Sequence, residues 1–148
     1  MAAVSYTARN VSANWDRNAV IENREANEAI EVGELVYLAS DDTVGLADMD
    51  ALDDFAKRVP WGICVSIAKS GVVAGIAGAT EAQDGDRVSI CTFGHVHGFS
   101  GLTPGQFLYG SNTAGAIENA APANQFVIGR ATHADTIFVS PGTFNAPS

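Results

Sequence analysis

GFSGLTPGQFLYGSNTAGAI, residues 98–117, joins glycine-rich turns to large, regularly placed apolar residues. Its Pro104–Gly105 pair is typical of a tight turn, because proline fixes one backbone angle and glycine accepts angles that other residues avoid. The next residues are aromatic and aliphatic, which favours a strand. The stretch therefore predicts a turn that leads directly into a short β-strand.

A similar phrase occurs earlier in the chain, in EAIEVGELVYLASDDTVGLA, residues 28–47. Gly33 precedes Tyr37 by four residues, as Gly105 precedes Tyr109. Each copy ends at a serine and is followed by turn residues and a second glycine. The spacing between the copies is too irregular for a solenoid. The repeat instead predicts one compact scaffold with two pseudo-symmetric halves.

The rest of the chain also reads as short strands between glycine turns. Gly62 and Gly129 each lie inside an apolar run, where glycine marks a bulge or a sharp bend. The strand-like runs are residues 34–40, 62–68, 71–77, 84–93, 106–111, 125–131 and 136–140. This pattern predicts an all-β fold, a small glycine-turned β-barrel or sandwich built from pseudo-repeated strand–turn units.

At most one short helix is expected, over residues 48–59. Asp48 or Asp50 would cap its start, and Pro60 would end it. Its apolar positions fall on one helical face: Leu52, Phe55, Ala56 and Val59.

Residues 1–27 differ from the remainder, since they are rich in Asn and Arg and contain no glycine. They are taken as an N-terminal arm, and residues 28–148 as the β-barrel domain. Two interpretations of the arm stay open. It is either an irregular first strand packed on its own domain, or a segment that lies on a neighbouring subunit with Tyr6, Val11 and Trp15 as anchors. We expect the barrel to fold when residues 1–20 are deleted; an unfolded product would show that these residues belong to the core.

Composition narrows the possible partners. The 148 residues carry 17 acidic and 8 basic side chains, a net charge of −9. The scattered basic residues argue against nucleic-acid binding. No apolar run approaches the roughly 20 residues that a membrane span needs. No secretion signal is seen at the start, so synthesis in a cytoplasm is expected.

Cys64 and Cys91 lie in apolar runs and are expected to be buried free thiols, with a disulfide as the alternative.

The sequence offers little that points to catalysis. There is no nucleophile elbow, phosphate loop or dinucleotide fingerprint, so neither an enzyme nor a cofactor is expected. His95 and His97 are two apart on an expected strand, would face the same side and could share a metal, with His133 as a third ligand. The alternative is a solvent-facing or interface pair, and we expect no metal site.

The two glycine phrases resemble a known family. GHVHGFSGLTPGQFLYGSNTAGAIENAAP and VIGRATHADTIFVSPG are similar to the C-terminal half of the head decoration, or capsid cement, proteins of tailed bacteriophages. The phrase at residues 33–47 resembles that family's first-half strand and return, and GICVSIAKSGVVAGIAGATEAQDGDRVSI resembles its hairpin. The resemblance covers residues 28–142.

The resemblance implies a β-barrel protein that forms a homotrimer and binds the major capsid protein on the outer surface of the virion. Such a protein would be made in the bacterial host cytoplasm and would stabilise the shell. Candidate contacts with the capsid or between subunits are Tyr6, Val11, Trp15 and Phe99. The alternative function is a receptor- or glycan-binding module of a head fibre or tail, with Trp15, Trp61 and Phe99 as stacking surfaces.

Overall fold

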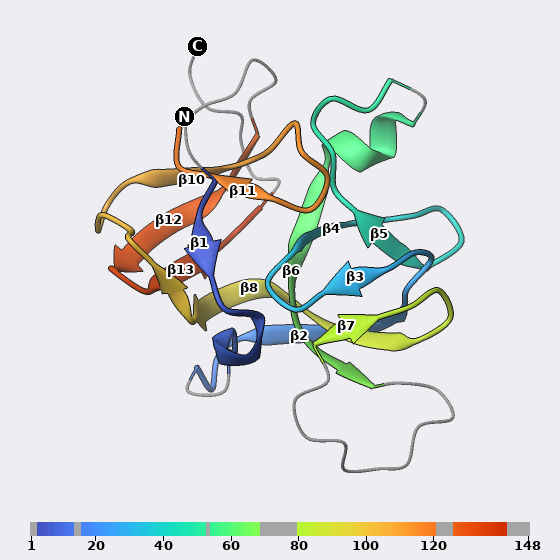
Figure 1. Ribbon diagram of the computed structural model, residues 1–148, viewed down its shortest axis with the longest axis horizontal. Coiled ribbons are helices and arrows are strands. Elements are labelled where there is room, and N and C mark those ends of the chain that lie inside the picture. Colours follow the sequence, from blue (N-terminus) through green and yellow to red (C-terminus); the bar gives the residue numbers. More distant parts are fainter. Residues whose placement is uncertain (1–2, 14–15, 53, 69–79, 121–125, 142–148) are drawn as a thin grey trace.

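The computed structural model describes residues 3–13, 16–52, 54–68, 80–120 and 126–141 of the chain. These residues form a curled, nearly all-β structure, so the predicted fold class is confirmed (Figure 1). The strands are β1 (Ser5–Tyr6), β2 (Val20–Glu25), β3 (Ile30–Glu31), β4 (Leu35–Leu38), β5 (Val44–Leu46), β6 (Pro60–Ala68), β7 (Glu81–Ala82), β8 (Arg87–His97), β9 (Phe99–Ser100), β10 (Phe107–Gly110), β11 (Ile117–Glu118), β12 (Val127–His133) and β13 (Thr136–Val139). Two 3-10 helices accompany them, η1 (Ala8–Asn10) and η2 (Phe55–Arg58).

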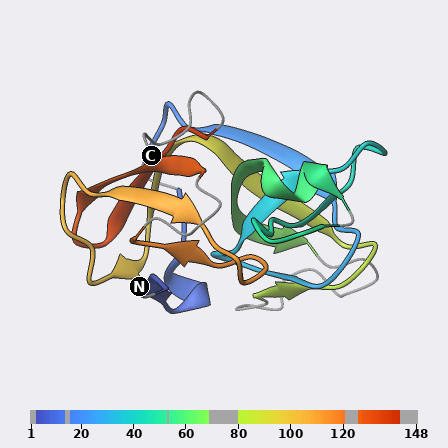
Figure 2. The ribbon, with the colours of Figure 1, turned by 90° about the horizontal axis from the view of Figure 1, so that it is seen from above.

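Most strands belong to one antiparallel sheet with the order β11-β10-β12-β13-β8-β6-β4-β5. The long strand β8 joins the two halves of this sheet. Its first part pairs with β6 and with β2, and its last part pairs with β13. Figure 2 shows the C-terminal strands, in orange and red, on one side and the strands of the first half, in green and cyan, on the other.

Strand pairing confirms the repeat that the two glycine phrases predict. The order β5-β4-β6 in the first half matches β11-β10-β12 in the second. Val36, three residues after Gly33, lies opposite Gly62, and Leu108, three residues after Gly105, lies opposite Gly129. In both halves the register shifts directly after this pair. The glycines inside the strands therefore occupy equivalent places at equivalent bulges.

The first half closes on itself through the end of β2. Ala26 forms a parallel bridge with Val44 on β5, and Asn27 N donates to the Val44 carbonyl at 2.8 Å. The Asn27 side chain also donates to Thr43 Oγ1 at 2.9 Å. Strands β5, β4, β6, β8 and β2 thus return to their starting point, as in a small barrel.

The second half is closed by residues 3–13. Val4 N donates to the Ile117 carbonyl at 2.8 Å, and β1 pairs with β9, where Ser5 lies opposite Ser100. Ser12 and His97 exchange backbone hydrogen bonds of 3.0 and 2.9 Å. The described N-terminal residues therefore pair with strands of their own chain.

These contacts correct the expected boundary between an arm and a barrel at residue 28. Val4, Val11, Ala13 and Ala26 are at most 8% exposed and belong to the hydrophobic core. Strand β2 pairs along most of its length with β8 in the main sheet. The irregular polar composition of residues 1–27 hid this role, because each short piece finds its partners far away in the sequence.

The expected helix over residues 48–59 is also corrected. Only one 3-10 turn forms, η2, and Asp54 caps it by accepting a hydrogen bond from Ala56 N at 3.0 Å. The side chains of Leu52 and Phe55 are exposed instead of covering a core. The strand expected at 71–77 lies outside the described residues, as does Trp15.

Candidate functional site

Of the four candidate contact residues, the three that the structure describes do not form an outward-facing surface. Val11 and Phe99 are each 3% exposed, because the first strand of the chain packs them against the second half. Phe99 meets the half-buried ring of Tyr6 edge to face, with 5.6 Å between the ring centroids. Val11 and Phe99 are therefore core residues, and their assignment to an interface is wrong. Trp15 lies outside the described residues.

Tyr6 connects the two halves of the molecule. Its ring lies so close to Gly33 that a Cβ atom there would overlap it. Burial, together with the carboxylates of Glu34 and Glu31, raises the pKa of Tyr6 to about 12. The neutral phenol is thus held between the first glycine phrase and Phe99.

His95 is engaged by a carboxylate of the N-terminal segment. Asp16 Oδ2 accepts the backbone N–H of His95 at 2.7 Å and lies 2.9 Å from its ring Nδ1. These hydrogen bonds, with one from Asn18 N, lower the pKa of Asp16. The His95 ring also packs near Phe138, with centroids 4.9 Å apart. The contacts fasten the segment around residue 16 to strand β8.

His97 lies two residues further along β8, and its backbone pairs with Ser12. His133, the third ligand considered, is exposed at the end of β12. Within the described ranges, no three His, Cys, Asp or Glu side chains are grouped closely enough to hold a metal ion. The described part of the chain also has no helix long and apolar enough to cross a membrane.

The two described residues among those considered for glycan stacking, Trp61 and Phe99, do not form a platform. Phe99 is in the core. The half-buried Trp61 ring is covered by the Arg24 guanidinium, whose central carbon lies 5.1 Å from the ring centroid. Arg24 also forms an ion pair with Glu22 at 3.5 Å.

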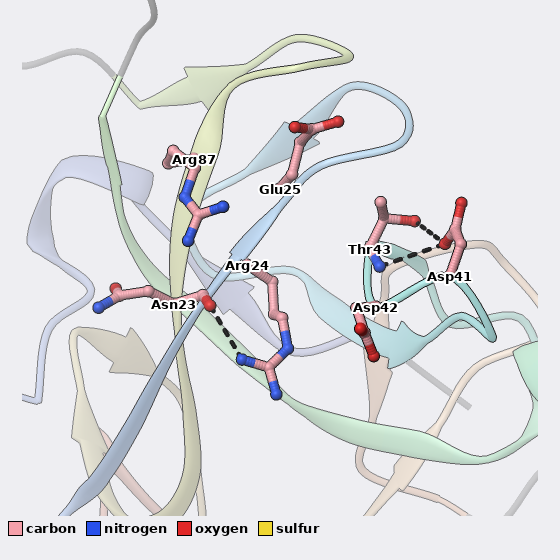
Figure 3. Close-up of a pocket in the computed structure, with 7 residues that line it drawn as sticks. All are labelled: Asn23, Arg24, Glu25, Asp41, Asp42, Thr43 and Arg87. Atoms are coloured by element: carbon pink, nitrogen blue, oxygen red, sulfur yellow. Dashed lines mark hydrogen bonds between the residues drawn. The ribbon is translucent and has the colours of Figure 1, made fainter.

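A polar hollow of about 660 Å³ opens where the first half closes (Figure 3). Strand β2, the start of β8 and the turn between β4 and β5 supply its walls. The residues that line it are Asn23, Arg24, Glu25, Asp41, Asp42, Thr43 and Arg87. Nothing in the sequence pointed to this hollow, because it depends on the bridge between β2 and β5.

Two of the charged groups of this hollow, Asp41 and Arg24, are engaged with near neighbours. Asp41 Oδ1 accepts hydrogen bonds from Thr43 Oγ1 at 2.6 Å and from Thr43 N at 3.2 Å, which lower the pKa of Asp41. The Arg24 guanidinium donates to the Asn23 carbonyl at 3.0 Å. Charges of both signs line a wide, open depression. The arrangement offers solvation for polar groups but no paired nucleophile and base.

Two other places on the surface gather large apolar side chains. The first is the loop between β5 and β6, where Leu52 is 89%, Phe55 75% and Val59 43% exposed. We call Leu52 and Phe55 the loop tip. Contiguous apolar surface on a soluble chain marks a site for another molecule.

The second place is the outer side of the C-terminal strands. Phe107 on β10, Arg130 on β12 and Phe138 on β13 lie directly opposite one another across the sheet. Phe93 packs edge to face on Phe138, with centroids 5.1 Å apart. We call Phe93, Phe107, Arg130 and Phe138 the aromatic face. Sequence reasoning missed it, although these residues occupy the outward positions of predicted strands.

No protein-family model matches the chain, and no curated protein is significantly similar to it. Its function is therefore argued from its own sequence and surface.

Proposed function

We propose that the chain is a structural protein of a phage virion. It binds the major capsid protein on the outer surface of an icosahedral shell, as a homotrimer, and stabilises that shell. The observation that carries the proposal is the set of large apolar side chains that stand exposed on a curled β body. Those from 36% to 89% exposed are Val20, Ile21, Leu38, Leu52, Phe55, Val59, Phe93 and Phe107.

Two further properties support the proposal. The phrases that resemble the capsid cement family form equivalent strands in the two halves of this chain, as a scaffold built from repeated turn-and-strand units would. The net charge of −9 disfavours non-specific aggregation of the protein. A shell presents many equivalent sites, so modest contacts on each copy add up over the lattice.

Co-sedimentation tests this function. Purified full-length protein is mixed with shells of its source phage that lack it, and the shells are pelleted. We expect saturable binding at a fixed ratio to the capsid protein and a higher melting temperature of the decorated shells. Shells that already carry a full complement of the protein are the control and should take up no more. Protein that stays in the supernatant at every concentration would refute the proposal.

A further inference from the structure

The loop between β5 and β6 holds its apolar tip in a defined shape. Asp48 N donates to the Lys57 carbonyl at 2.8 Å, which ties the two ends of the loop together. Arg58 Nε donates to the Ala51 carbonyl at 2.7 Å, which braces its middle. A loop braced in this way loses little conformational freedom when it binds a partner.

The exposed end of this loop is acidic as well as apolar. Asp50 is exposed, and Asp54 caps η2 next to Phe55. The two cations of the loop, Lys57 and Arg58, are half-buried behind the tip. The tip therefore presents two large apolar side chains with carboxylates beside them.

A small hollow on the aromatic face is complementary to the loop tip, because it is lined by apolar side chains and one cation. Its volume is about 210 Å³, and its lining residues are Phe107, Val127, Gly129, Arg130, Phe138 and Ser140. An apolar cavity of about 150 Å³ holds one benzene molecule. The hollow thus has room for one phenyl ring, and it is smaller than the roughly 300 Å³ at which small-molecule sites begin.

Arg130 supplies the only cation of this hollow. Its guanidinium lies over the Phe107 ring, 5.4 Å from the centroid. No carboxylate in the described part of the chain forms an ion pair with it. An anion brought next to Arg130 would therefore meet an unneutralised charge in partly apolar surroundings, where charge pairing is stronger than in water.

We propose that the loop tip docks in this hollow on a second copy of the chain. The Phe55 ring would pack into the hollow beside Arg130, Phe107 and Phe138 of the partner subunit, with Asp50 close to the Arg130 guanidinium. Phe55 is 75% exposed, so it does not fill the hollow of its own chain. In Figure 1 the green coil of η2 lies on the side away from β10, β12 and β13.

This contact joins different surfaces of the two copies. Such head-to-tail contacts form a ring when the rotation between copies closes. The inference rests on the self-association in the proposed function and adds the surfaces that carry it. It is tested without any shell, so the contact between copies and the binding to a capsid can fail separately.

Sedimentation velocity of the full-length protein, from about 1 to about 100 μM, tests the contact. Phe55→Glu changes the tip and Arg130→Glu changes the hollow, both at exposed positions. Ile21→Glu is the matched control, because it places the same charge on an exposed apolar residue outside both surfaces. We expect the control to associate like the wild type. Either test variant should raise the dissociation constant on the order of 30-fold or more.

Mixing the two test variants distinguishes this contact from any symmetric one. Phe55→Glu keeps an intact hollow and Arg130→Glu keeps an intact tip, so the mixture should form dimers and nothing larger. Circular dichroism of each variant confirms that it is folded. A chain that ends at residue 141 should associate normally, since the contact does not use residues 142–148. A monomeric wild type, a monomeric mixture, a test variant that associates like the control, or a monomeric shortened chain would each overturn the proposal.

Discussion

Cys64 and Cys91 lie on neighbouring strands, but their side chains point to opposite faces of the sheet. Cys64 is opposite Ile90, and Cys91 is opposite Ile63. Adjacent residues of a strand alternate between its faces, so the two sulfur atoms cannot meet. Both are free thiols with no exposed surface, as expected from the apolar runs around them. Burial raises the pKa of Cys64 to about 12 and that of Cys91 to about 11.

These thiols make the stability of the fold depend on alkaline pH. Below pH 9 they are protonated in both the folded and the unfolded chain. Above pH 9 the unfolded chain releases these protons while the folded chain retains them, so unfolding is favoured as the pH rises. Each thiol lowers the free energy of unfolding by up to about 1.4 kcal/mol per pH unit in this range.

Urea unfolding at pH 8, 9, 10 and 11 checks this prediction. Cys64→Ala should show a shallower loss of stability than the wild type between pH 9 and 11, whatever its stability at pH 8. Lysine and tyrosine titrations are common to both proteins and cancel in the comparison. Parallel pH profiles for the two proteins would contradict a buried, protonated Cys64.

For single residues, the sequence predicts which side chains are buried better than it predicts which side chains touch each other. Apolar runs correctly predict that both cysteines are inside. The same reasoning could not place Phe99 against Tyr6, because the two residues meet only through the pairing of β1 with β9. When a segment such as residues 1–27 has no clear secondary-structure pattern, its aromatic residues are easily mistaken for surface anchors.

At the scale of elements, the N-terminal segment depends on a close backbone approach at Gly98. This glycine follows β8 and has a φ of 108°. A Cβ atom at Gly98 would overlap the carbonyl of Asn10. Gly105 has a similar φ of 90°, but a Cβ there would meet nothing within 4 Å. A substitution at Gly105 therefore tests backbone strain alone, whereas one at Gly98 tests backbone strain together with lost packing.

Gly98→Ala should lower the free energy of unfolding by about 3 kcal/mol or more, since it pushes residues 3–13 off the second half. Gly105→Ala, its matched control, should cost only about 1 to 2 kcal/mol of backbone strain. Denaturant midpoints of both variants give the comparison. Equal losses would mean that the N-terminal segment is not packed against Gly98.

Local pattern predicted the strands with strong turns and missed those without them. Strands β4, β10, β12 and β13 follow glycine or alternation signals, and they form where expected. Strand β2 is half polar, because it pairs with β8 but buries none of its side chains fully. The surface sites could not be predicted from local pattern either. The aromatic face and both hollows exist only after strands from distant parts of the chain pair.

At the scale of the whole molecule, the two pseudo-symmetric halves are interlocked. Leu35 N of the first half donates to the Gly115 carbonyl of the second at 2.8 Å, and Gly115 N donates to Ala47 at 2.8 Å. Met49 N donates to Ser111 at 3.0 Å. With β8 shared as well, neither half has a complete hydrogen-bond network of its own.

The halves should therefore unfold together. Native-state hydrogen exchange measures this, with amides of β6 reporting on the first half and amides of β12 on the second. We expect the most protected amides in both strands to share one opening free energy, equal to the global value. A lower value confined to β12 would show instead that the second half opens alone.

The closure of the second half by the first residues has a consequence for biosynthesis. Val4 is synthesised more than a hundred residues before its hydrogen-bond partner Ile117. At roughly 5 to 20 residues per second, that interval is on the order of ten seconds. During it Val4 and Val11 are apolar residues without a core to enter. The second half cannot close before Ile117 has been synthesised, so chaperones that shield these residues during the interval should raise the yield of folded protein.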